Sequence, residues 1–186
     1  MLNPGKGAVM IQQAARFAAK AHEGKMRKGS EIPYIVHPLE TAVIVSRMTE
    51  DPEIISAALL HDVLEDTEVT FEELSEAFGT RVAGLVAAES EEDKRKTWKE
   101  RKQATIERLA AASREEKLLC LADKLSNLRS TTADYLLKGE AVWLKFRMKD
   151  KKEHEWYYRG VLEQLSDLSE EPAYGEYKEL LALLFG

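Results

Sequence analysis

One stretch of the chain gathers an imidazole and three carboxylates within six residues. The apolar run 54–60 ends abruptly, and His61, Asp62, Glu65 and Asp66 follow it. A protein core does not accept so many ionisable groups unless they are paired or bound to a cation. The stretch therefore indicates a metal site combined with acid/base chemistry.

Two further side chains are candidates for the same site. His37 directly precedes Pro38, which we expect to hold this histidine in an extended conformation and to begin a helix after it. Asp123 lies in a segment whose leucines form a helical stripe, and Asn127 stands four residues after it on the same helix face.

These side chains form a mixed nitrogen and oxygen ligand set, comprising His37, His61, Asp62 and Asp123. Such a set suits Mn²⁺, Fe²⁺ or Zn²⁺ and leaves coordination positions open for water and substrate. A bound ion lowers the pKa of a water and polarises a phosphoryl oxygen. Glu65 and Asp66, if they are not ligands, would orient that water and protonate the leaving group.

The elements that must position these groups are helices. Apolar residues recur near a 3.6-residue period, and capping-box spacing appears at Thr70 with Glu73 and at Ser113 with Glu116. We predict an all-α fold whose helices cover approximately residues 8–23, 38–49, 52–64, 70–78, 80–89, 98–111, 114–131, 140–148, 150–168 and 173–184. The segment 24–33 has no hydrophobic periodicity and is expected to be an exposed connection.

Length and composition favour one domain over residues 1–186, with 8–131 carrying the motifs and 132–186 adding C-terminal helices that complete it. The single cysteine, Cys120, excludes an internal disulfide and indicates a reducing compartment. The sequence contains no membrane-length apolar run and no signal-peptide core, so we expect a cytoplasmic protein without a membrane partner. A net charge of −6 argues against nucleic-acid binding.

At this point the residues resemble a known family. The pattern H…HD…D, formed by His37, His61-Asp62 and Asp123, is that of the HD superfamily. The longer strings 21–28, 33–38, 58–67 and 121–129 are similar to the hydrolase domain of RelA/SpoT-type alarmone enzymes, above all to small alarmone hydrolases that lack a synthetase. The resemblance covers about residues 8–131.

This resemblance implies an HD-domain helical bundle with one mononuclear metal site. The implied reaction is the Mn²⁺-dependent removal of pyrophosphate from the 3′ position of guanosine 3′,5′-bis(diphosphate), which leaves GDP or GTP. Glu65 and Asp66 would be the catalytic carboxylates. Arg27 and Lys28 match the family's basic pair near the nucleotide, and Asn127 matches an asparagine that reaches the ribose and base.

Two departures bear on the substrate. The loop 29–33 is about one residue longer than the family pattern, so its contacts with the base, and with them the base specificity, are expected to differ. The run 89–93 is acidic where alarmone hydrolases have a short Thr-Lys element, so phosphate binding would pass to Lys94, Arg95 or Lys102.

Two other functions stay open beside this one. The same site would serve an HD-type phosphomonoesterase that acts on a deoxynucleoside monophosphate or on NADPH. A non-catalytic nucleotide sensor that keeps the metal as a staple is the other alternative, although it has no need of the pair Glu65 and Asp66.

The sequence leaves monomer and homo-oligomer open, and it predicts an exposed position for His154 in its charged segment.

Overall fold

The computed structural model describes residues 4–90 and 95–186. Over these residues it contains ten α-helices and two short 3₁₀ helices, and the β-type pairing there is limited to one antiparallel bridge between Met26 and Pro33. The predicted all-α fold is confirmed.

The first half of the chain forms α1 (Pro4–Ala21), α2 (Val36–Val45), α3 (Pro52–Leu60), α4 (Val63–Asp66), α5 (Phe71–Phe78) and α6 (Thr80–Glu89). The second half forms α7 (Trp98–Ala110), α8 (Arg114–Lys138), the 3₁₀ helix η1 (Gly139–Lys145), α9 (Lys151–Gln164), the 3₁₀ helix η2 (Ser166–Leu168) and α10 (Pro172–Phe185).

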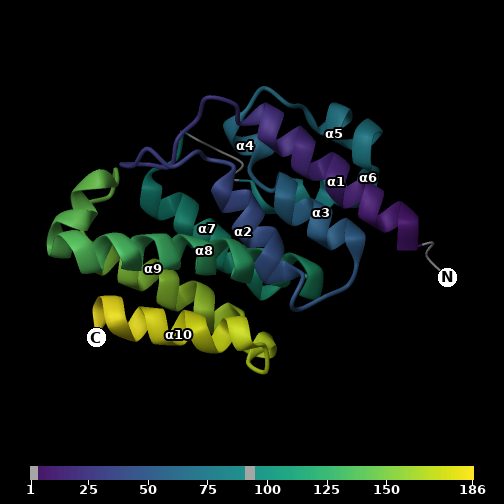
Figure 1. Ribbon diagram of the computed structural model, residues 1–186. Coiled ribbons are helices and arrows are strands. Elements are labelled where there is room, and N and C mark those ends of the chain that lie inside the picture. The colour runs from purple at the N-terminus through teal and green to yellow at the C-terminus, as the bar shows by residue number, and fades with distance from the viewer. Residues whose placement is uncertain (1–3, 91–94) are drawn as a thin grey trace.

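The long helix α8 runs through the middle of the molecule (Figure 1). On one side it packs against α2, α3 and α6, and on the other side it packs against α10. The helix α9 lies against α10 and α7. One cluster of buried apolar side chains extends through these layers, from Ala14 in α1 to Leu184 in α10.

Local sequence explains where α8 begins and which face it buries. The Ser113 side chain accepts a hydrogen bond from the Glu116 N–H, and the Glu116 carboxylate accepts one from the Ser113 N–H, which completes the predicted capping box. The predicted leucine stripe, Leu118, Leu121, Leu125 and Leu128, is buried. Asp123 and Asn127 lie beside this stripe and are joined by a hydrogen bond of 2.7 Å from Asn127 Nδ2 to Asp123 Oδ1.

Three predicted helices differ from the structure. The segment 150–168 divides into α9, which ends at Gln164, and the 3₁₀ helix η2. The segment 52–64 is not one helix, because α3 ends at Leu60 and a separate turn, α4, carries Glu65 and Asp66. The segment 140–148 is not α-helical: α8 continues to Lys138, Gly139 leaves it with a φ of 57°, and a 3₁₀ helix follows. A positive φ is open to glycine at little steric expense, and it ends the helix there.

The conformation predicted for His37 is also wrong. The helix α2 begins at Val36, so His37 lies in its first turn and Pro38 is its third residue. The first four N–H groups of a helix have no partner within the helix, so the missing N–H of a proline in that turn removes no helical hydrogen bond.

Among the described helices, none is both long and apolar enough to cross a membrane.

Candidate active site

Four side chains from three segments converge at one point. His37 comes from α2, His61 and Asp62 from the junction of α3 and α4, and Asp123 from α8. His37 Nε2 lies 3.1 Å from His61 Nε2, 3.0 Å from Asp123 Oδ1 and 3.5 Å from Asp62 Oδ2. His61 Nε2 lies 3.0 Å from Asp62 Oδ2 and 3.6 Å from Asp123 Oδ1. The structure thus brings together all four predicted ligands.

The orientation of His61 fits a cation site. Its Nδ1 lies 2.8 Å from the Ala58 carbonyl oxygen, which can only accept, so Nδ1 carries a proton and the lone pair of the neutral ring is on Nε2. The Nε2 lone pair is then aimed at a second imidazole nitrogen and two carboxylate oxygens. His37, His61 and Asp123 are all buried, and a divalent cation at their meeting point would satisfy this donor set.

The electrostatics of the buried cluster agree with this fit. Burial lowers the pKa of His61, but the Asp62 and Asp123 carboxylates outweigh it and hold that pKa well above its usual value. Burial likewise opposes ionisation of Asp62, yet the neighbouring imidazoles keep its pKa below the usual range. Two carboxylates therefore supply negative charge that a bound cation would neutralise in place of protons.

Hydrogen bonds from neighbouring side chains hold both carboxylates in place. The Tyr34 hydroxyl donates to Asp62 Oδ2 at 2.6 Å, and burial followed by the nearby Asp62 charge raises the pKa of Tyr34, so the phenol keeps its proton. Asp123 accepts from Asn127 at Oδ1 and from the Lys124 ammonium at Oδ2. The geometry of the four convergent side chains thus depends also on the residues around them.

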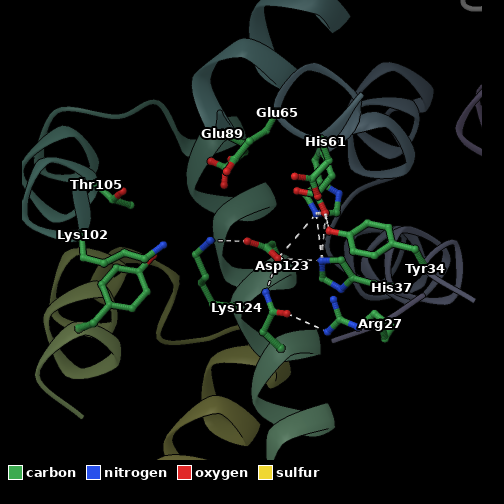
Figure 2. A pocket seen from close by; sticks show the side chains of 14 residues that line it. Arg27, Tyr34, His37, His61, Glu65, Glu89, Lys102, Thr105, Asp123 and Lys124 are labelled. Atoms are coloured by element: carbon green, nitrogen blue, oxygen red, sulfur yellow. Dashed lines mark hydrogen bonds and ion pairs between the residues drawn. The ribbon is translucent and has the colours of Figure 1, made fainter. Parts of the chain in front are cut away.

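Glu65 and Asp66 line a cavity of about 170 Å³ that opens onto this cluster. Figure 2 shows Glu65 and Glu89 at one end, the two histidines and Arg27 along one wall, and Lys102 and Thr105 across from them. The other lining residues are Tyr34, Asp62, Asp123, Lys124, Asn127 and Tyr157. The predicted catalytic pair therefore faces the same space as the predicted metal ligands.

A larger cavity of about 510 Å³ adjoins the first and shares Glu65, Asp66 and Lys102 with it. Four cationic side chains line this larger cavity, namely Lys28, Arg101, Lys102 and Arg147, together with Trp98, Phe146, Met148 and His154. Although the chain carries a net charge of −6, the space beside the cluster of histidines and aspartates is bordered by positive groups and aromatic surface. Such a lining suits an anionic ligand with a planar ring.

The predicted substrate contacts divide among these cavities. Arg27 NH2 donates to Asn127 Oδ1 at 2.9 Å, and both side chains line the metal cavity. Lys28 lies outside that cavity but lines the larger one, and burial lowers its pKa, with Arg147 and Lys145 adding to the effect. Lys94 lies outside the described residues.

Two buried groups escaped the sequence interpretation. Glu89 belongs to the acidic run of the sequence, yet its side chain is 3% exposed, and burial is the main reason that its pKa is raised. It follows Val82 and Val86 at helical spacing on the buried face of α6, and that spacing was the available signal. His154 was predicted to be exposed and is buried, because it shares a face of α9 with Tyr157 and Val161.

Comparisons with known proteins agree with these features. The family model of the HD domain matches residues 14–146 of this chain. The Danio rerio guanosine-3′,5′-bis(diphosphate) 3′-pyrophosphohydrolase MESH1 is 43% identical over 131 residues, which are 69% of this chain and 72% of that protein. The bifunctional (p)ppGpp synthase/hydrolase SpoT of Escherichia coli is 40% identical over 126 residues, which are 64% of this chain and 18% of SpoT.

A solved structure of a metazoan ortholog of SpoT that hydrolyses ppGpp has a TM-score of 0.74 to this fold at 29% identity, over 95% of this chain and 93% of that chain. The match of the HD-domain family model covers most of the chain, and the range that it matches includes all four convergent histidines and aspartates. The chain belongs to the HD-domain family, in the branch that contains MESH1 and SpoT.

Proposed function

We propose that this protein is a metal-dependent hydrolase that removes the 3′-pyrophosphate of guanosine 3′,5′-bis(diphosphate). The main observation in support is a single cavity that is lined by the cluster of histidines and aspartates, by Glu65 and Asp66, and by the cationic side chains of Arg27 and Lys102. Membership in the branch of MESH1 and SpoT supports the substrate, since MESH1 is named for this reaction.

We propose Mn²⁺ as the ion and His37, His61, Asp62 and Asp123 as its ligands. Bound there, Mn²⁺ would lower the pKa of a water and polarise a phosphoryl oxygen. The donor set of two imidazoles and two carboxylates supports Mn²⁺ or Fe²⁺, and it is also compatible with Zn²⁺.

The roles of the other residues follow from charge and position. One carboxylate of the pair Glu65 and Asp66 accepts a proton from the attacking water, and the other gives a proton to the 3′ oxygen as its bond to phosphorus breaks. The products are GDP, with a free 3′ hydroxyl, and pyrophosphate. Arg27 and Lys102 neutralise phosphate charge, and the Arg27 contact with Asn127 fixes the guanidinium beside the ribose and base.

We also propose that residues 1–186 form one domain in the cytoplasm. The contacts of α10 with α8 and of α9 with α7 support the inclusion of the C-terminal helices, and His154 of α9 lines the larger cavity. The buried single thiol of Cys120 is consistent with a reducing compartment.

The test is a product analysis. Mn²⁺-loaded protein is incubated with guanosine 3′,5′-bis(diphosphate), and the products are separated by anion exchange. We expect GDP and pyrophosphate, a loss of about 10²-fold or more in rate for Asp66→Asn, and no turnover after the metal is stripped. Asp167→Asn is the matched control, because Asp167 is half exposed and pairs only with Lys117 among the described residues.

Release of phosphate from NADPH or from a nucleoside monophosphate, without turnover of the alarmone, would replace this proposal with a phosphomonoesterase. Binding of the nucleotide without any turnover would favour the sensor.

A further inference from the structure

The helices α2 and α8 meet in two successive polar contacts. The first is His37 with Asp123, whose Nε2 and Oδ1 atoms are 3.0 Å apart. Each helix then carries a polar residue three positions further on, Glu40 and Ser126, on the same face. These two side chains form the second contact, a hydrogen bond of 2.7 Å from Ser126 Oγ to Glu40 Oε2.

Ser126 joins the two contacts. Its Oγ also lies 2.8 Å from Nδ1 of His37, the ring nitrogen that faces away from the metal cluster. Ser126 is 1% exposed and His37 is 3% exposed, so no solvent competes at this point. A serine hydroxyl has one proton, and the group that receives this proton decides which hydrogen-bond role remains for the imidazole.

Glu40 is held so that it can only accept. Arg129 NH1 donates to its Oε1 at 3.0 Å. The same guanidinium donates from Nε and NH2 to both carboxylate oxygens of Glu176 in α10, at 2.6 and 2.7 Å. A carboxylate paired with a guanidinium has no proton to give, so the Ser126 hydroxyl points to Glu40.

The direction of the remaining bond follows. With its proton directed to Glu40, Ser126 Oγ presents a lone pair to His37, and Nδ1 must be the donor. The lone pair of His37 is then on Nε2, which faces His61 and Asp123. If the hydroxyl pointed to Nδ1 instead, Nε2 would carry the proton and could not bind a cation.

We propose that Glu40 and Ser126 are positioning residues that hold His37 in its metal-binding tautomer. Arg129 of α8 anchors Glu40 and is itself held by Glu176 of the C-terminal helix α10. This inference rests on the metal centre of the proposed function but not on its substrate. Glu40 of α2 and Ser126 of α8 would thus fix the proton on Nδ1 of His37, as the Ala58 carbonyl oxygen does for His61.

The test measures binding of Mn²⁺ alone, by competition with a chelator, in the full chain. Ser126→Ala removes the acceptor for Nδ1–H, and we expect a dissociation constant about 10- to 100-fold larger. Glu40→Gln can donate as well as accept, so it frees the hydroxyl to turn, and we expect a weakening of about 10-fold. The control, Glu171→Gln, breaks a carboxylate–arginine pair with Arg114 away from the cluster and is expected to leave the constant unchanged.

A second readout separates positioning from helix packing. In Zn²⁺-loaded protein with ¹⁵N-labelled histidine, long-range proton–nitrogen NMR spectra are expected to show the His37 proton on Nδ1. In Glu40→Gln this signal is expected to exchange faster with water or to be lost, whereas Glu171→Gln retains it. A purely packing role would leave the signal intact in both variants.

The outcomes are distinguishable. If the parent chain binds no Mn²⁺ and no Zn²⁺, the proposed metal centre is wrong and this inference falls with it. If the parent binds Mn²⁺ and both variants, folded by circular dichroism, bind it equally well, this inference alone is overturned. Should Ser126→Ala not fold, Glu40→Gln decides the matter, because Glu40 lies partly in solvent.

Discussion

His154 is a histidine whose surroundings favour its neutral form. Its Nε2 donates to the Met148 carbonyl oxygen at 2.8 Å, and its ring contacts Trp98, Trp143 and Phe146. Burial is the largest cause that lowers its pKa below the usual 6.5. The unfolded chain therefore binds a proton at this residue at higher pH than the folded chain does.

We predict that protonation of His154 lowers the free energy of unfolding at acidic pH. The stabilising contribution of the neutral ring is complete above pH 6.5, and it is lost progressively as the pH falls below 6.5 toward the lower pKa of the folded state. His154→Gln keeps an N–H donor for Met148 but does not titrate. Urea unfolding midpoints between about pH 5 and pH 8, with the metal chelated, should decline less steeply in this variant than in the parent. Equal slopes would show that His154 is not the source.

At the scale of the element, α9 approaches α7 closely at Gly160. A Cβ at this glycine would lie 2.6 Å from Cδ1 of Ile106, closer than carbon atoms pack. The helix α7 carries Lys102 and Thr105 to the metal cavity, so this close approach helps to set the width of the site. Alanine is favoured over glycine by about 1 kcal/mol in a helix interior, and overpacking costs about 1–3 kcal/mol.

We predict that the overpacking prevails in Gly160→Ala, with a net loss of about 1 kcal/mol in the free energy of unfolding. In an Ile106→Val background, which lacks the clashing Cδ1, the same change should become neutral or stabilising. The double-mutant cycle should therefore give a coupling of about 1 kcal/mol or more, measured by urea unfolding. Additive effects would mean that α9 shifts to avoid the contact.

At the scale of the whole molecule, the proposed metal site joins segments that are far apart in the chain. Its proposed ligands come from α2, from the α3–α4 junction and from α8, and they meet only in the folded state. A cation that binds these ligands is consequently bound by the folded chain and not by the unfolded chain.

We predict that Mn²⁺ at 100 times its dissociation constant raises the free energy of unfolding by about 2.7 kcal/mol, which corresponds to roughly 5–10 °C in Tm for a chain of this size. Differential scanning calorimetry with Mn²⁺ and with EDTA measures the shift. Asp123→Asn lacks one ligand charge, and its Tm should respond weakly to the metal. A shift of equal size in Asp123→Asn would place the bound ion elsewhere.

The sequence by itself determined the features that depend on near neighbours in the chain. Helical periodicity and capping boxes predicted an all-α fold, and adjacency placed His61 and Asp62 in one site. The four-residue step from Asp123 to Asn127 predicted a shared helix face, and the two side chains are hydrogen bonded. These features are local because one helix turn brings residues three and four apart together.

Tertiary structure decided which helix faces meet. Arg27 reaches Asn127 across 100 positions of the chain, and Glu40 reaches Ser126 across 86. A hydrophobic period shows that a face is buried but not what covers it. The spacing of Glu89 after Val82 and Val86 indicates a buried position, but not that this carboxylate lines the site cavity. The tautomer of His37 is of this kind, because it is set by a hydrogen bond between two helices and not by the residue that follows it in the chain.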